Sequence, residues 1–266
     1  MKPLAVLSPA VRHAIRGVFV DVDNTLTTDG RLTAQAYSAL ERLQDAGVLA
    51  VPITGRPAGW CDHIARMWPV DAVVGENGAF YFRYDHTQHK MHRRFLLDEE
   101  ERAKNRQRLD DLCDAILSQV PGAAVSADQA YRESDLAIDY CEDVPLLPSS
   151  TVARIVSLFE QAGAVAKVSS IHVNGWFGDY DKLKMTRIMA HECFGIDLDT
   201  DKASYVFVGD SPNDAPMFDY FPNAIGVANI QEFIDRLESE PAYVTQARCG
   251  EGFAEVVDTL LNSIGK

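Results

Sequence analysis

Short apolar runs alternate with segments of helical spacing along both ends of the chain. The apolar runs that we expect to be strands lie at 17–20, 48–53, 71–74, 80–82, 205–208 and 224–227. The helical patterns between and after them cover 32–46, 56–68, 182–194 and 252–264. Continuous apolar strands separated by helices are typical of a parallel sheet that is covered on both faces. The pattern therefore predicts an α/β fold with a doubly wound parallel sheet.

The middle of the chain has a different pattern. Two helical segments occur together with shorter alternating segments that are typical of half-exposed strands: helices over 99–120 and 150–162, strands over 136–141, 164–170 and 171–175. This mixture predicts a small α+β lobe inserted into the first domain. We expect a core domain made of residues 1–85 and 179–266, and a cap domain made of residues 86–178.

Composition and charge limit the possible partners. The 266 residues carry a formal net charge of -14, which disfavours a nucleic-acid partner. No apolar run approaches the roughly 20 residues of a membrane helix. Prolines and basic residues interrupt the first 17 residues, which we interpret as an N-terminal extension rather than a signal peptide. The five scattered cysteines favour buried free thiols in a reducing cytoplasm, and the oligomeric state stays unknown.

Pairs of aspartates follow two of the predicted strands. Asp21 and Asp23 come directly after strand 17–20, and Asp210 and Asp214 come after strand 205–208. In open parallel sheets, ligands bind beyond the carboxyl ends of the strands, and carboxylate oxygens suit Mg²⁺. A calcium loop that starts at Asp21 is excluded, because its sixth and twelfth positions are both leucine. The alternative interpretation of each pair is an acidic turn.

Two further features could bind an anion near these carboxylates. Thr54 and Gly55 follow strand 48–53 and precede a helix, so they offer a hydroxyl and main-chain N–H groups. Taken alone, this motif is better explained by a plain helix cap. Lys182 begins the helix after the inserted lobe, where its ammonium could neutralise carboxylates. Lys184 is a rival that periodicity cannot separate from it.

These motifs together resemble those of the haloacid dehalogenase superfamily, and specifically its members with a type IIB cap, the Cof-like and sugar-phosphate phosphatases. The first motif, D-x-D-x-T, matches Asp21, Asp23 and Thr25, and the fourth, G-D-x-x-N-D, matches Gly209 to Asp214. Thr54 matches the second motif and Lys182 the third. The sequence departs from the common pattern at Asn24 and Leu183, where such proteins often carry glycine.

The resemblance implies roles for these residues. Asp21 is expected to be the nucleophile and Asp23 the general acid and base. Residues implied to bind the transferring phosphoryl group are Thr54, Gly55, Lys182 and Asn213. Residues implied to hold Mg²⁺ are Asp21, Asp210, Asp23 through its main-chain carbonyl, and Asp214, which could instead orient Lys182.

The expected function is hydrolysis of a small phosphorylated metabolite, such as a sugar phosphate or a related phosphomonoester, through an aspartyl phosphate. A phosphomutase that uses the same nucleophile is the alternative enzyme, and a binding module on the same fold is the alternative without catalysis. Candidates for substrate contact in the cap are His172, Asn174, Trp176, Arg132 and Tyr131. Candidates at the core–cap edge are Arg56, Glu76 and Asn77. Each is equally compatible with packing or a surface position.

Overall fold

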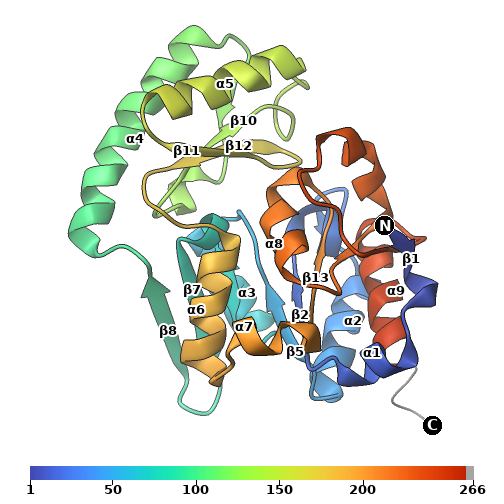
Figure 1. Ribbon diagram of the computed structural model, residues 1–266. Coiled ribbons are helices and arrows are strands. Elements are labelled where there is room, and N and C mark those ends of the chain that lie inside the picture. The colour runs from blue at the N-terminus through green and yellow to red at the C-terminus, as the bar shows by residue number, and fades with distance from the viewer. Residues whose placement is uncertain (262–266) are drawn as a thin grey trace.

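The computed structural model describes residues 1–261, which fold around a parallel sheet with a smaller lobe above it (Figure 1). The sheet has six strands in the order β1-β15-β14-β13-β2-β5, and every neighbouring pair is parallel. Its strands are β1 (Lys2–Pro3), β2 (Gly17–Val20), β5 (Leu49–Pro52), β13 (Tyr205–Gly209), β14 (Ile225–Gly226) and β15 (Tyr243–Val244). The predicted α/β class and parallel sheet are confirmed.

Alternating side chains bury both faces of this sheet. In β2, Val18 and Val20 pack in one apolar cluster, whereas Phe19 packs in the cluster on the opposite face. Helices contributing to the first cluster are α1 (Pro9–Ala14), α2 (Ala34–Asp45), α3 (Ala58–Met67) and α9 (Cys249–Leu261). Helices contributing to the second are α6 (Lys182–Phe194), α7 (Leu198–Asp201) and α8 (Ala215–Tyr220). The central strands are thus covered on both sides, as their apolar sequences require.

Helix α6 carries Lys182 at its first position, and local sequence signals define both of its ends. The Asp181 carboxylate accepts a hydrogen bond from the Lys184 N–H and begins the helix. Gly195, with φ 67°, ends it in the left-handed conformation. The predicted range 182–194 is confirmed. The last helix begins at Cys249, three residues before the predicted start, and its predicted end at 264 lies outside the described residues.

The smaller lobe contains helices α4 (Glu99–Gln119) and α5 (Ser149–Gln161) on a four-stranded antiparallel sheet. Its strand order is β11-β12-β10-β9, with β9 (Ala124–Val125), β10 (Leu136–Asp139), β11 (Val165–Val168) and β12 (His172–Trp176). A separate apolar cluster fills this lobe, from Leu109 in α4 to Phe177 after β12. Figure 1 shows it above the carboxyl ends of the parallel strands.

An antiparallel hairpin at the side of the core precedes the cap in sequence (Figure 1). Strand β6 (Val73–Gly75), which bridges Ile53 in parallel, pairs with β7 (Phe80–Asp85), and β7 pairs with β8 (Lys90–Phe95). Phe80, Phe82 and Phe95 pack in the core cluster rather than in the cap cluster. The expected boundary at residue 86 therefore falls in the turn of this hairpin, and the division into 1–85, 86–178 and 179–266 stays a prediction.

The first 17 residues are part of the core. Strand β1 pairs with β15, and Leu4 and Leu7 are each only 1% exposed. A small flap, β3 (Thr27–Thr28) with β4 (Arg31–Leu32), follows the end of β2. All five cysteines are free thiols, but only Cys61 is buried and the other four are half-buried. Within residues 1–261, the structure contains no helix with the length and apolar character needed to span a membrane.

Candidate active site

The two aspartate motifs meet at the carboxyl edge of the sheet. Strands β2 and β13 are neighbours, and the Asp21 N–H donates to the Val208 carbonyl at 2.9 Å. Asp21 is 5% exposed and Asp210 is 1% exposed. The chain turns sharply after β2 at Asn24, whose φ of 56° lies in the left-handed region that asparagine tolerates better than most residues. Asn24 can therefore adopt the backbone conformation of this turn, at a position where similar proteins often carry glycine.

Three carboxylates gather at this edge. Asp21, Asp210 and Asp214 each offer an oxygen, and these oxygens lie within 4.8 Å of one another. Thr25 donates to one oxygen of Asp210 at 3.3 Å, and Asn229 donates to the other at 3.2 Å. An all-oxygen donor set held in this way fits a hard cation such as Mg²⁺.

Asp214 also has a second set of contacts. Its Oδ2 accepts hydrogen bonds from the main-chain N–H groups of Asp210 and Ser211, at 3.2 and 3.4 Å. Its Oδ1 accepts from the Lys182 ammonium at 2.7 Å. The contact with the ammonium fits a role of Asp214 in orienting Lys182, and its oxygen in the acidic cluster keeps it a candidate ligand of a cation.

Lys182 is the lysine that reaches the acidic cluster. Its Nζ contacts Asp21 Oδ1 and Asp214 Oδ1, each at 2.7 Å, and the side chain is only 4% exposed. Lys184 is exposed and contacts Asp179 instead, at 2.9 Å. The geometry therefore assigns the position expected for the motif lysine to Lys182, although Leu183 replaces the glycine that often follows it.

Burial and mutual repulsion perturb the titration of the cluster. Burial raises the pKa of Asp21 to about 7, partly opposed by Lys182. Burial and the nearby Asp21 raise the pKa of Asp210 well above its usual range. Burial works against the charged form of Lys182, but Asp21 and Asp214 still raise its pKa above the usual value. Placing these carboxylates side by side in a buried site therefore disfavours their simultaneous ionisation.

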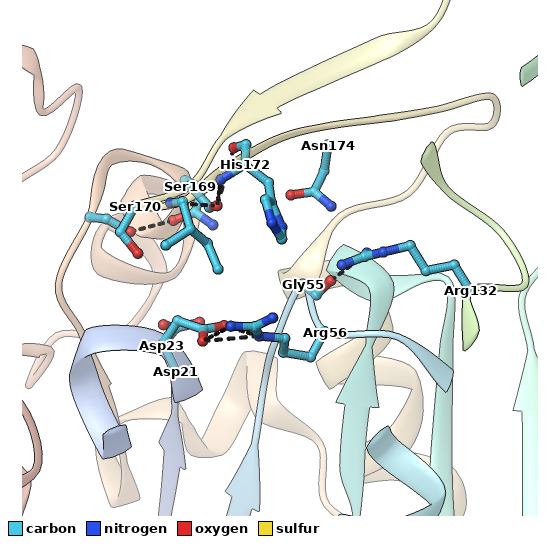
Figure 2. Close-up of a pocket in the computed structure, with 12 residues that line it drawn as sticks. Asp21, Asp23, Gly55, Arg56, Arg132, Ser169, Ser170, His172 and Asn174 are labelled. Atoms are coloured by element: carbon cyan, nitrogen blue, oxygen red, sulfur yellow. Dashed lines mark hydrogen bonds and ion pairs between the residues drawn. The ribbon is translucent and has the colours of Figure 1, made fainter. Parts of the chain in front are cut away.

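Asp23 points to a different partner. Arg56 Nε lies 3.0 Å from each oxygen of the Asp23 carboxylate, and Nη2 lies 2.9 Å from Oδ1 (Figure 2). The same guanidinium contacts Asp128 at 3.3 Å and Glu142 at 2.7 Å, and it stacks over Trp60. Arg56 therefore links the expected general acid to two carboxylates of the cap.

The expected phosphate-binding residues lie around the same point. Gly55 and Asn213 line a cavity together with Asp21 and Asp23. Thr54 is fully buried next to it, and its hydroxyl accepts a hydrogen bond from the Arg56 N–H at 3.0 Å. Asn213 accepts a hydrogen bond from the Ser211 hydroxyl at 2.7 Å. Ser211 also lines the cavity.

The cap closes this cavity from above. Figure 2 shows His172, Asn174, Ser169 and Ser170 facing the aspartates, with Arg132 at the side, and all five line the cavity. The remaining volume is about 20 Å³, which is room for little more than one water molecule. Substrate entry therefore requires the cap to move away from the core.

Two of the expected cap candidates lie elsewhere. Trp176 is buried and stacks on Tyr180, and its indole N–H donates to the Tyr180 carbonyl at 3.2 Å. Tyr131 is 59% exposed and lies against Gly59 of α3. Neither lines the cavity between Asp21 and the cap.

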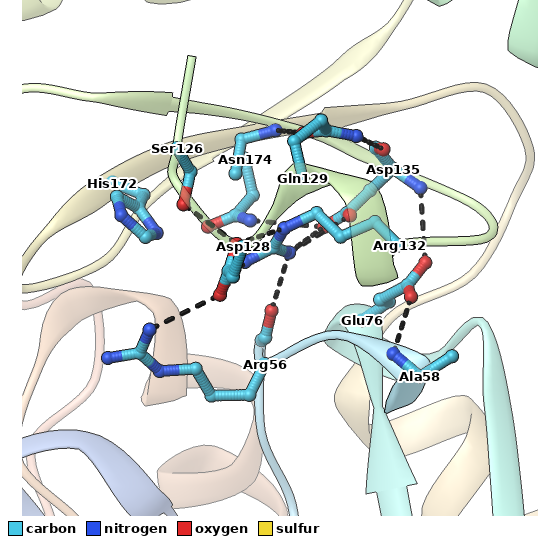
Figure 3. Close-up of polar contacts among 12 residues, drawn as sticks. Arg56, Ala58, Glu76, Ser126, Asp128, Gln129, Arg132, Asp135, His172 and Asn174 are labelled. Atoms are coloured by element: carbon cyan, nitrogen blue, oxygen red, sulfur yellow. Dashed lines mark hydrogen bonds and ion pairs between the residues drawn. The ribbon is translucent and has the colours of Figure 1, made fainter. Parts of the chain in front are cut away.

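Glu76 joins the core to the cap instead of facing the cavity. This fully buried carboxylate accepts hydrogen bonds from Ala58 N–H of the core and from the N–H groups of residues 133, 134 and 135 of the cap (Figure 3). Arg132 strengthens the same contact by donating to the Gly55 carbonyl at 2.8 Å. Asn77, the neighbour of Glu76, is also buried and does not line the cavity.

Sequence reasoning missed several polar residues of the site. Asn229 follows the predicted strand 224–227 by two positions, so the strand-edge argument used for Asp210 could have found it. Asp128 and Glu142 lie in cap loops without a periodic pattern, and no local signal marks them. Ser169 and Ser170 fall in a segment that we expected to be strand.

Comparison with known proteins agrees with this geometry. Residues 18–137 match the family described as haloacid dehalogenase-like hydrolase. The phosphoglycolate phosphatase of Methanosarcina mazei is 27% identical over 251 residues, which cover 92% of this chain and 96% of that protein. The phosphoglycolate phosphatase of Haloarcula marismortui is 45% identical, but only over 62 residues, about a quarter of each chain.

Solved structures share the fold over nearly the whole chain. A Thermoplasma acidophilum protein superposes with a TM-score of 0.69 at 19% identity, covering 92% of this chain and 98% of that one. The sucrose-phosphatase of Synechocystis superposes with a TM-score of 0.63 at 15% identity, covering 92% and 97%. These structures show the shared fold. The family match over residues 18–137 and the phosphatase relatives support both the resemblance to the haloacid dehalogenase superfamily and the expected enzyme class, a phosphoric monoester hydrolase.

Proposed function

We propose that this protein is a magnesium-dependent phosphatase that hydrolyses a small phosphomonoester through an aspartyl phosphate. The observation that supports this most directly is the Lys182 ammonium between Asp21 and Asp214, with Asp210 beside them. A buried carboxylate held by a lysine at a cation-binding edge is positioned to attack a phosphoryl group that the same charges hold. The phosphoglycolate phosphatase relatives support a small substrate.

Asp21 is the proposed nucleophile. Lys182 occupies its Oδ1, which leaves Oδ2 without a hydrogen-bond partner among residues 1–261. In the first step, this oxygen bonds to phosphorus and the bond from phosphorus to the leaving oxygen breaks. Asp21 and Asp210, with the main-chain carbonyl of Asp23, are the proposed ligands of Mg²⁺. Bound Mg²⁺ supplies positive charge that offsets the repulsion between carboxylate and phosphate.

Asp23 is the proposed general acid and base. It gives a proton to the leaving oxygen and later takes one from the water that attacks the aspartyl phosphate, which breaks the bond between phosphorus and Asp21. In the closed structure, Arg56 contacts both oxygens of Asp23. Proton donation requires one of these oxygens to carry a proton, so Asp23 has to loosen its contact with Arg56 before the first step.

Release of inorganic phosphate tests the proposal. Phosphoglycolate and a panel of sugar phosphates are assayed with and without Mg²⁺, and isomer formation is followed in parallel because a phosphomutase would give that product. Asp21→Asn should lower turnover by more than about 10³-fold, and Asp23→Asn by about 10²- to 10⁴-fold. The control is Asp219→Asn, the same change at an exposed position of α8. An active Asp21→Asn protein with normal turnover would refute the nucleophile.

A further inference from the structure

Glu142 is a cap carboxylate that lies beside two basic side chains, Arg56 and His172. It lies in the segment between β10 and α5, and its side chain is 28% exposed. Arg56 Nη2 lies 2.7 Å from its Oε1, and Arg56 Nη1 lies 3.4 Å from its Oε2. On the other side, His172 Nε2 lies 2.8 Å from Oε2. The carboxylate therefore lies between the Arg56 guanidinium of the core and the His172 imidazole of the cap.

The two basic groups are built into the site, whereas the carboxylate is peripheral. Arg56 is 4% exposed and His172 is 2% exposed, and both line the cavity above Asp21. Glu142 does not line that cavity and approaches the pair from the rim. A guanidinium fork beside an imidazole is the donor arrangement that recognises a carboxylate. The contacts with His172 and Arg56 lower the pKa of Glu142 to about 2, so it is an anion under ordinary conditions.

The place of this anion site relative to Asp23 limits the size of a ligand. The guanidinium that contacts Glu142 through Nη2 also contacts Asp23 through Nε and Nη2. In a phosphorylated two-carbon acid, a single carbon separates the ester oxygen from the carboxylate. The group that protonates the ester oxygen and the group that binds the carboxylate must then be neighbours. In this chain a single guanidinium joins them.

Charge balance favours exchange of one carboxylate for another. Arg56 faces three carboxylates, those of Asp23, Asp128 and Glu142. A substrate carboxylate that replaces Glu142 leaves this count unchanged and keeps the buried guanidinium and imidazole paired. A neutral leaving group would displace Glu142 without replacing its contacts, which costs binding energy.

We propose that Arg56 and His172 bind the carboxylate of a small phosphorylated acid, and that Glu142 occupies their site in the closed structure until the substrate displaces it. This inference rests on the proposed phosphatase function and assigns its substrate class. Glu142 then acts as an internal competitor that excludes neutral phosphomonoesters more strongly than acidic ones.

A fixed latch is the alternative role of Glu142. If its contact with Arg56 only held the cap closed, loss of the carboxylate would weaken closure for every substrate alike. The two roles predict opposite changes in KM, so steady-state kinetics on two matched substrates separates them.

The test compares phosphoglycolate with 2-hydroxyethyl phosphate, which has an alcohol in place of the carboxylate. Glu142→Gln should lower KM for phosphoglycolate by about tenfold, because the internal competitor loses its charge. His172→Gln should raise KM for phosphoglycolate by about tenfold and change KM for the neutral substrate much less. The control is Glu160→Gln, which removes the same charge from an exposed position of the cap helix α5.

The outcomes separate this inference from the proposed function. Equal loss of kcat/KM for both substrates in Glu142→Gln, or equal effects of His172→Gln on both, would overturn the carboxylate site while leaving the phosphatase intact. Failure of the wild type to release phosphate from either substrate would refute the proposed function. In that case, calorimetric binding of the two compounds to Asp21→Asn still decides whether Arg56 and His172 prefer the acid.

Discussion

Replacing Lys182 by methionine removes the ammonium that contacts Asp21 and Asp214 while keeping most of the side-chain volume. Lys182 lies 2.7 Å from both Asp21 and Asp214, which are 8% and 0% exposed at their side chains. Loss of the ammonium leaves two buried carboxylates without their cationic partner. Breaking a buried pair in this way typically costs about 3–5 kcal/mol. We therefore expect the free energy of unfolding of Lys182→Met, measured without divalent cations, to fall by that amount.

Lys184→Met is the matched control, because it makes the same change two residues away in α6. Lys184 contacts the fully exposed Asp179, and its own side chain is 44% exposed. Exposed ion pairs contribute about 0–1 kcal/mol, so this variant should unfold close to the wild type. It should also keep its turnover, whereas Lys182→Met should lose at least about 10²-fold in kcat.

Urea unfolding followed by circular dichroism measures both variants under the same conditions, and phosphate release measures their activity. The reasoning is refuted if Lys182→Met unfolds within about 1 kcal/mol of the wild type. It is also refuted if Lys184→Met loses as much stability or activity as Lys182→Met. Either result would mean that the ammonium between Asp21 and Asp214 does not hold the cluster together.

Three other changes test separate parts of the structure. Glu142→Gln should lower the free energy of unfolding at neutral pH, because folding lowers the pKa of Glu142 to about 2. Urea unfolding at several pH values should show the difference between variant and wild type shrinking as pH falls from about 4.5 towards about 2. Glu76→Gln should destabilise the protein by about 3 kcal/mol in urea, since an amide replaces one oxygen that accepts main-chain N–H groups of core and cap. Mg²⁺ at 100 times its Kd should stabilise the wild type by about 2.7 kcal/mol in thermal unfolding, and Asp210→Asn should lose most of this gain.

The strands of the core could be predicted because each is marked by a continuous apolar run in its own sequence. A strand whose two faces are both covered must be apolar at every position, as in the run Gly17 to Val20. Once such strands are parallel neighbours, the residues that follow them must lie at one edge. This is why Asp21 and Asp210 were expected at one edge of the sheet, whereas Lys182 was placed beside them only by the resemblance.

Elements without a local signal were missed or misjudged. Strand β8 reads Lys-Met-His-Arg-Arg-Phe, and its charged side chains hide the pairing with β7 that places it against the core. Strand β1 is only two residues long, too short for any periodicity, so the N-terminal stretch was interpreted as an extension. Glu76 was a candidate for substrate contact at the core–cap edge. The structure places it at that edge, but its cap partners there are main-chain N–H groups, which no residue type in the sequence marks.

The charges around the cavity support the proposed cation independently of any resemblance. Arg56 is matched by Asp23, Asp128 and Glu142, and Lys182 is matched by Asp21 and Asp214. Each of these two cations is thus already outnumbered by carboxylates before a phosphate arrives. Asp210 adds a further buried carboxylate, and the side chains that donate to it, Thr25 and Asn229, are neutral. The proposed divalent cation, bound by these oxygens, would add positive charge where the carboxylates converge and so lower the repulsion that a phosphate dianion meets as it approaches Asp21.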